Sequence, residues 1–275
     1  MTKASLIGHT IEVYVRFTAK PNLPSDITIR NFFRERKYLG SSDRRFIAET
    51  YFGTIKQYLR LEALAQDAIK TKFNHPQLII SAYLLTFSDE SPTEIQTIIA
   101  GLGNDFARNY PLDVFEKMSD RRREERRLKQ LPFTERLAVF YSFPLWFVQS
   151  LEKENGVDSV ESILRSLNEE APIALRANRN VVTRDELRSE LAALGVETDP
   201  STLSEDALVV RKRINMWDLG PFKQGHFEVQ DEASQIVAPF ANITSKKIRV
   251  LDACAGAGGK SLHFASLLRG HGEIF

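Results

Sequence analysis

The first half of the chain carries apolar residues at helical spacing. Between Ser42 and Phe73 they recur every three or four positions, which predicts one face of an amphipathic helix. Leu78 to Phe87 is apolar nearly all round, as expected for a helix buried on most sides at the centre of a bundle. Ser91 with Glu94 forms a capping box, so another helix is predicted from there to about Gly101. This half of the chain is therefore predicted to be all-α.

The pattern changes near Leu131, where prolines and aromatic residues gather, so we place the first domain boundary between residues 133 and 134. Beyond it, short apolar runs alternate with helical stretches, which predicts a mixture of helices and strands. Helices are predicted at 144–154, 158–167, 184–194 and 232–240, and strands at 173–178, 208–210, 226–229 and 247–252. We interpret residues 134–212 as a small α+β module and residues 213–275 as the beginning of an α/β domain. The predicted fold class is multi-domain.

Charge is unevenly distributed, although the formal net charge is only +1. The segment from Arg30 to Arg45 holds six basic and two acidic residues, and the segment from Lys117 to Lys129 holds seven basic and three acidic residues. Each run by itself is typical of a solvated helix face. Two such runs in one helical region favour a polyanionic partner.

Composition excludes several other classes. Hydrophobic residues make up 43% and charged residues 27% of the chain, as in ordinary soluble globular proteins. The N-terminus lacks the features of a signal peptide, and no run approaches the roughly 18 apolar residues of a membrane span. Cys254 is the lone cysteine, which excludes a disulfide framework and a cysteine-based zinc site. We therefore predict a cytoplasmic protein without a metal and without a membrane partner.

The strongest chemical signal is the segment from Val250 to Ser261, VLDACAGAGGKS, in which an apolar run enters a glycine-rich turn. A P-loop requires glycine at the position of Cys254, and a dinucleotide-binding turn requires glycine at the position of Ser261. The first loop of a class I methyltransferase fits better, because Asp252 ends the strand and small residues then let a ligand approach the main chain. An ordinary tight strand-to-helix turn is the alternative.

Four segments together resemble one known family. VLDACAGAGGKS resembles the S-adenosylmethionine-binding motif of the Sun-family RNA cytosine-C5 methyltransferases, and Gly225–Gln235 is similar to the segment that precedes that motif. Ala171–Asn178 resembles the first strand of the family's small α+β module. Asp43–Gly53 is similar to a helix of the NusB-like RNA-binding domain in the bacterial small-subunit rRNA members. Ala257 stands where proline is common in the motif, which keeps the residue small.

The resemblance implies a NusB-like helical bundle in residues 1–133, the α+β module in 134–212, and the start of a Rossmann-type methyltransferase domain in 213–275. It implies methyl transfer from S-adenosylmethionine to a cytosine C5 of RNA, expected to be small-subunit (16S) rRNA. In this family the nucleophilic cysteine and the acids that hold the ribose and adenine come later in the sequence. No catalytic residue is therefore expected here, and the chain is predicted to be an N-terminal fragment that is inactive alone. The residues implied to bind the cofactor are Cys254, Ala255, Gly256, Ala257, Gly258, Gly259 and Lys260.

A protein of another class remains an alternative at this point. It would be a non-catalytic RNA-binding or ribosome-assembly protein, in which the glycine turn only packs against the module. An ATPase is disfavoured by Cys254, which replaces the leading glycine of a P-loop. In our preferred interpretation the protein is a monomer with an RNA partner.

Some single residues have both a structural and a functional interpretation. Cys254 is interpreted as a small packing residue rather than the nucleophile. His226 and His263 are more typical of structural or surface histidines than of acid or base groups. Arg176 and Asn178 either contact RNA or are simply exposed. Helix N-caps are predicted at Asp158, Thr183 and Asp231.

Overall fold

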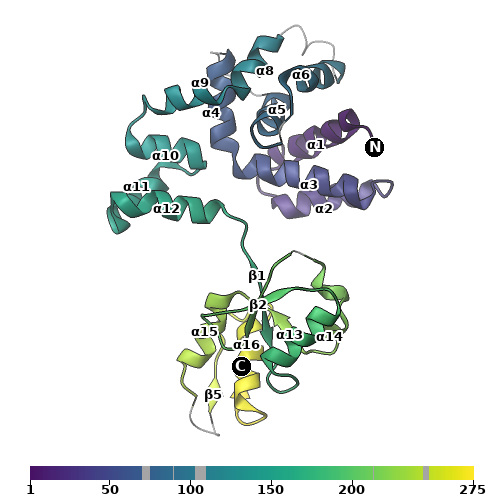
Figure 1. Cartoon of the computed structure of the whole chain (residues 1–275), viewed down its shortest axis with the longest axis vertical. Coiled ribbons are helices and arrows are strands. Elements are labelled where there is room, and N and C mark those ends of the chain that lie inside the picture. The colour runs from purple at the N-terminus through teal and green to yellow at the C-terminus, as the bar shows by residue number, and fades with distance from the viewer. Residues whose placement is uncertain (70–74, 89, 103–109, 213, 244–247) are drawn as a thin grey trace. The chain divides into compact units, whose positions relative to one another are not determined.

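The computed structural model describes residues 1–69, 75–88, 90–102, 110–212, 214–243 and 248–275. Two compact units divide the chain, residues 1–169 and residues 170–275, and each is described by itself. This division falls between the boundaries predicted at 133/134 and 212/213, which stay predictions about domains. The multi-domain, helix-rich class with a small sheet is confirmed (Figure 1).

The described residues of the first unit form helices only (Figure 1). The helices are α1 (Lys3–Thr18), α2 (Ser25–Glu35), α3 (Ser41–Lys56), α4 (Tyr58–Ile69), α5 (Pro76–Phe87), α6 (Pro92–Gly101), α8 (Leu112–Ser119), α9 (Arg121–Leu128), α10 (Phe133–Tyr141), α11 (Leu145–Asn155) and α12 (Val157–Asn168). In α5, Leu78, Ile80 and Leu84 are fully buried, which confirms the predicted central helix. Helix α3 packs closely on α5 at Gly53, where any side chain would overlap the Tyr83 ring.

The single helix predicted between Ser42 and Phe73 is wrong, because two helices, α3 and α4, occupy this segment. The break lies at Gln57, whose φ of −98° and ψ of 13° are not helical. The Ser142 hydroxyl, at the end of α10, accepts a hydrogen bond of 3.0 Å from the backbone N–H of Leu59. It thereby satisfies one of the free amides at the start of α4. The predicted end at Phe73 lies outside the described residues.

A smaller apolar cluster joins α10, α11 and α12 through Leu137, Val148 and Leu164. Helix α11 confirms the helix predicted at 144–154. Helix α12 begins at Val157, directly after Gly156, whose φ of 79° turns the chain. No side chain caps this helix, so the N-cap predicted at Asp158 is wrong: the flexible glycine makes the turn instead.

The second unit contains a four-stranded antiparallel sheet with strand order β2-β3-β1-β4. Its elements, in chain order, are β1 (Ile173–Ala177), α13 (Arg184–Ala193), β2 (Thr198–Pro200), β3 (Ala207–Val210), the 3-10 turn η1 (Met216–Asp218), α14 (Gly220–Lys223), β4 (Phe227–Val229), α15 (Glu232–Phe240), β5 (Arg249–Val250), α16 (Gly259–Leu268) and β6 (Glu273–Ile274). Strands β1, β3 and β4 confirm three predicted strands. Strand β2 was not predicted, and its Pro200 is tolerated because β2 lies at the sheet edge.

Two predicted caps in this unit are confirmed. The Thr183 hydroxyl accepts a 3.3 Å hydrogen bond from the Glu186 N–H, and the Glu186 carboxylate accepts one of 2.8 Å from the Thr183 N–H. The Asp231 carboxylate accepts a 3.2 Å hydrogen bond from the Ser234 N–H at the start of α15. These local signals therefore fix the first turns of α13 and α15.

A two-stranded parallel sheet carries the glycine-rich segment. Strand β5 pairs with β6, with Arg249 opposite Glu273 and Val250 opposite Ile274. The strand predicted at 247–252 is thus confirmed only at Arg249 and Val250, and Lys247 lies outside the described residues. Helix α16 connects the two strands, since parallel strands require a crossover connection.

Candidate functional site

The glycine-rich segment forms an open turn between β5 and α16. Gly256 has a φ of 53° and Gly258 a φ of 85°, a conformation that residues with a Cβ rarely adopt. A side chain at Gly258 would meet no atom within 4 Å, so this glycine is required by the backbone conformation and not by crowding. Residues 254–257 are exposed, and residues 258–260 are partly exposed. The main chain of the turn is therefore accessible to a ligand.

Asp252 shapes this turn from within. One oxygen of its carboxylate accepts a hydrogen bond from the Cys254 N–H at 3.3 Å, and the other accepts one from the Ser261 hydroxyl at 2.7 Å. Its own N–H donates to the carbonyl of Phe275 at 2.8 Å, next to β6. Both carboxylate oxygens of Asp252 therefore accept hydrogen bonds from the turn itself. Asp252 fixes the conformation of the turn instead of offering its carboxylate to a ligand.

A buried polar pair lies against the start of α16. The Nε of Arg176, on β1, donates a 2.6 Å hydrogen bond to the side-chain oxygen of Gln230, and the two residues are only 2% and 7% exposed. The amide nitrogen of Gln230 would lie 3.8 Å from a Cβ placed on Gly259. Burial lowers the pKa of Arg176 because the charged form is poorly solvated there. The sheet thus supports the glycine turn through two polar side chains.

His263, one helical turn into α16, is also buried, with 2% of its surface exposed. Neither ring nitrogen has a hydrogen-bond partner among the described residues. Burial, helped by the positive charge of Arg176, lowers the pKa of His263 to about 4. The imidazole is therefore neutral at pH 7, which excludes it as a charged contact to phosphate in this conformation.

A second glutamine, Gln235, extends this polar layer and is fully buried. Its amide nitrogen donates to the carbonyl of Gln230 at 2.9 Å, and its side-chain oxygen accepts from the Ser204 hydroxyl at 2.9 Å. Sequence reasoning missed both glutamines, since glutamine is usually a surface residue. The only available signal was the likeness of residues 225–235 to a family segment, and the structure explains it physically as the support of the turn.

Several single-residue interpretations are corrected by the structure. Cys254 is exposed, so the packing role expected for it is wrong. Arg176 is buried and neither exposed nor able to reach RNA, because it faces Gln230. Asn178 is partly buried, and its amide donates to the Gly225 carbonyl at 3.0 Å. His226 lies 2.8 Å from a carboxylate oxygen of Glu190, which supports the structural interpretation of this histidine.

The first basic run, in α2 and α3, is only partly neutralised by neighbouring carboxylates. Arg36 contacts both Glu12 and Glu35, and Arg30 lies 3.4 Å from Asp26. Arg44 lies over the Phe33 ring. Within the part of the chain that the structure describes, the basic residues of this run without an ion pair are Arg34, Lys37, Arg44 and Arg45.

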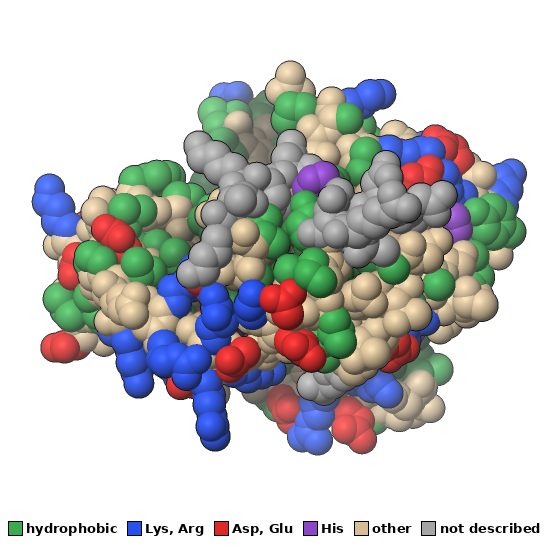
Figure 2. Space-filling model, turned by 90° about the horizontal axis from the view of Figure 1, so that it is seen from above, with side chains coloured by type: hydrophobic (Ala, Val, Ile, Leu, Met, Phe, Trp, Pro, Cys, Tyr) green, Lys and Arg blue, Asp and Glu red, His purple; other side chains and the backbone are tan. Residues whose placement is uncertain are grey.

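The second basic run, in α9, has an inner and an outer side. On the inner side, Arg123 pairs with Asp67 at 2.6 Å, and the partly buried Arg127 donates to the Ala63 carbonyl at 3.2 Å. On the outer side, Arg121, Arg122 and Arg126 are exposed. Lys and Arg side chains gather over α9 on the face shown in Figure 2. This face can attract a polyanion.

Two further features are absent from the described residues. No group of three or more His, Cys, Asp or Glu side chains there is arranged to hold a metal ion. Among the same residues, no helix has both the length and the apolar character needed to cross a bilayer.

Comparison with known proteins shows which class of protein this chain resembles. Residues 143–216 match the model of the family described as "Methyltr_RsmF/B-like, ferredoxin-like domain". This match covers α11, α12 and the strands β1 to β3. The solved structure described as "Crystal Structure of PH0851" has the same fold, with a TM-score of 0.66 and 20% identity over 100% of this chain and 63% of that one. Over residues 143–216 the chain is thus similar to RsmF/B-like methyltransferases.

Curated relatives narrow the relationship. The "Probable ribosomal RNA small subunit methyltransferase B" of Bacillus subtilis is 26% identical over 100% of this chain and 62% of its own length. The "Ribosomal RNA small subunit methyltransferase B" of Vibrio cholerae is 27% identical over 80% of this chain and 52% of its own length. The resemblance to the Sun-family rRNA methyltransferases is therefore confirmed. The chain spans about half to three fifths of the length of these relatives.

Proposed function

We propose that this chain is part of an RNA methyltransferase that transfers a methyl group from S-adenosylmethionine to a cytosine C5 of small-subunit rRNA. The observation that carries the proposal is the accessible main chain of the turn at 254–260, which follows a strand and begins a helix. The relatives named as rRNA methyltransferases support the reaction class and the RNA substrate. A methyltransferase family implies a methyl donor.

The cofactor turn supplies binding and orientation in this proposal. S-adenosylmethionine supplies the transferable methyl group when it is bound. The exposed residues 254–257 and the first residues of α16 line its amino-acid and ribose parts, because free N–H groups at a helix start favour a carboxylate. Gly256 and Gly258 leave the main chain uncovered, and Asp252 fixes the turn. The residues proposed to bind remain Cys254, Ala255, Gly256, Ala257, Gly258, Gly259 and Lys260.

RNA binding is assigned to the helical part of the chain. We propose that residues 1–133 form a NusB-like RNA-binding domain and that residues 213–275 begin a Rossmann-type domain. The outward side of α9 supports the first assignment, because exposed arginines attract phosphate without a need for a shaped cleft. No catalytic residue is assigned within the chain, and Cys254 is placed in the cofactor turn rather than at the target base.

Calorimetry with S-adenosylmethionine tests the cofactor assignment. We expect Gly258→Val to weaken binding at least about tenfold, because a Cβ at a φ of 85° forces the turn to rearrange. Gly195→Val is the matched control. Gly195 has a φ of 77° and no atom within 4 Å of an added Cβ, but it lies just after α13 and not in the glycine turn. Equal binding by Gly258→Val and Gly195→Val would contradict the assignment.

A further inference from the structure

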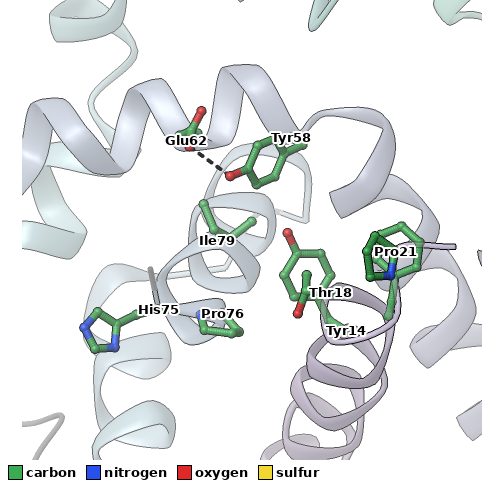
Figure 3. A pocket seen from close by; sticks show the side chains of 9 residues that line it. Tyr14, Thr18, Pro21, Tyr58, Glu62, His75, Pro76 and Ile79 are labelled. Carbon is green, nitrogen blue, oxygen red and sulfur yellow. Dashed lines mark hydrogen bonds between the residues drawn. The ribbon is translucent and has the colours of Figure 1, made fainter. Parts of the chain in front are cut away.

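A cavity in the first unit is not used by the proposed methyl transfer. It lies between α1, α4 and α5 and has a volume of about 340 Å³ (Figure 3). This volume is within the range of sites for small ligands. The lining residues are Tyr14, Phe17, Thr18, Pro21, Tyr58, Glu62, His75, Pro76 and Ile79.

The floor of this cavity contains the side chain of Tyr14. Tyr14 is only 4% exposed, and Figure 3 shows its ring pointing from α1 toward the space between α4 and α5. Its hydroxyl makes no hydrogen bond within the described residues. Burial raises the pKa of Tyr14, so the hydroxyl keeps its proton and can donate it. The hydroxyl is therefore available to donate a hydrogen bond to a ligand in the cavity.

The opposite wall presents an acceptor. The Tyr58 hydroxyl donates a 2.8 Å hydrogen bond to a carboxylate oxygen of Glu62 (Figure 3). Burial, with the Glu62 contact, raises the pKa of Tyr58 to about 12, so this hydrogen bond persists at pH 7. The second carboxylate oxygen of Glu62 remains open to a ligand that has N–H donors. The aromatic rings of Tyr14, Phe17 and Tyr58 offer flat apolar surface beside it.

We propose that this cavity binds a single unstacked guanine base of the RNA, an inference that rests on the proposed RNA substrate. Guanine combines a flat ring with a carbonyl acceptor and two adjacent N–H donors, which match the Tyr14 hydroxyl and the Glu62 carboxylate. Adenine lacks the carbonyl, and pyrimidines fill less of the space. Proteins commonly recognise single-stranded RNA by stacking on aromatic rings and by hydrogen bonds to base edges.

The rim of the cavity fits a base that enters from solvent. Thr18, Pro21 and Tyr58 are exposed at the opening, whereas Tyr14 and Ile79 are buried below them. Lys20, between Thr18 and Pro21 in sequence, is exposed and makes no ion pair within the described residues. Its ammonium group can therefore contact the phosphate of the bound nucleotide.

Fluorescence anisotropy with short RNAs tests this site. The probes are an oligouridine that carries one central guanosine, the same oligomer with a central adenosine, and the oligouridine itself. We expect the guanosine oligomer to bind about tenfold more tightly than the other two, which corresponds to one charge-assisted hydrogen bond. Glu62→Gln should abolish this preference, and Tyr14→Phe should reduce it.

Glu116→Gln is the matched control, because Glu116 is exposed on α8, is absent from the lining, and carries the same charge. It should keep the preference for guanosine. A wild-type protein without this preference would overturn the proposal, as would an equal loss for all oligomers in Glu62→Gln. An NMR titration with guanosine monophosphate separates the guanine site from the proposed RNA substrate. Binding of the nucleotide without any RNA binding would support the guanine site and contradict the RNA substrate. No binding of the nucleotide would contradict the guanine site.

Discussion

Two arginines withdrawn from solvent, one in each unit, have different partners. Arg60, on α4, donates from Nε and Nη2 to the two oxygens of Glu124 on α9, at 2.7 and 2.9 Å. Arg176, on β1, donates from Nε to the neutral Gln230. Within the described ranges, no carboxylate lies at ion-pair distance from Arg176. The charge of Arg60 is therefore balanced by a carboxylate in direct contact, and the charge of Arg176 is not.

The difference shows how each unit uses a buried charge. The Arg60–Glu124 pair joins two helices, with Arg60 4.3 Å from the centre of the Phe140 ring. Its charges cancel, so its effect is local. Arg176 instead polarises its neighbours: it holds Gln230 in place and disfavours a proton on His263. An unneutralised buried charge is costly, which is expected where polar support is needed near a site.

The largest expected effect on stability comes from removing the carboxylate that pairs with Arg60, which leaves Arg60 without an ion pair, like Arg176. Glu124→Gln leaves a buried guanidinium without its carboxylate, so we expect the free energy of unfolding to fall by about 3 kcal/mol. Urea denaturation followed by far-UV circular dichroism measures this change. Glu125→Gln, at the next and exposed position, should change stability by less than about 0.5 kcal/mol. A similar decrease in the free energy of unfolding in both variants would contradict a specific contribution of the Arg60–Glu124 pair.

The pH dependence of the free energy of unfolding tests the effect of burial and of Arg176 on His263. Because the pKa of His263 is about 4 in the folded chain, against 6.5 ordinarily, the unfolded chain gains a proton first as the pH falls. Stability is therefore complete above pH 6.5 and decreases toward pH 4. Between about pH 7.5 and 5 the loss should be about 2 kcal/mol.

His263→Leu removes this titration while keeping a buried side chain of similar size. Its free energy of unfolding, measured by urea denaturation at several pH values, should be flatter than that of the unmodified chain in this window. The difference between the two curves isolates His263 from the other titrating groups. Parallel curves would mean that His263 is not held neutral by its surroundings.

The smallest expected effect comes from giving Arg176 a carboxylate. Gln230→Glu converts a hydrogen bond to a neutral acceptor into one to a charged acceptor, so we expect a gain of about 1 kcal/mol, seen as a higher melting temperature. Gln235→Glu should do the opposite, because it loses the amide that donates to the Gln230 carbonyl. A loss in both variants would indicate that position 230 requires the amide for another contact.

Local sequence signals predicted much of this fold. The all-round apolar pattern of α5 and the capping box at Thr183 each act within one helix, so the sequence contains the whole cause. The break at Gln57 could not be predicted, because its partner, Ser142, comes from a distant helix. Arg176 was misassigned for a similar reason: a charged residue on a strand is expected at the surface unless its buried partner is known.

The candidate turn illustrates the same limit. Glycine spacing and Asp252 predicted a strand, a turn and a helix, and the structure contains all three. The residues that hold the turn from behind are spread over β1, the end of β4 and α15. Their proximity depends on antiparallel pairing of β1 with β4, which brings Arg176 opposite Glu228, two positions before Gln230. No local pattern contains that register.

Ser142 also bears on the order in which the helical unit folds. It adopts a φ of 60°, which is unfavourable for serine, and its hydroxyl reaches an amide 83 positions earlier in the chain. A contact so distant in sequence closes late, because loop closure must come first. The contact by which α10 caps the start of α4 is thus expected among the later ones to form. A feature of two neighbouring helices therefore depends on a part of the chain that comes much later in the sequence.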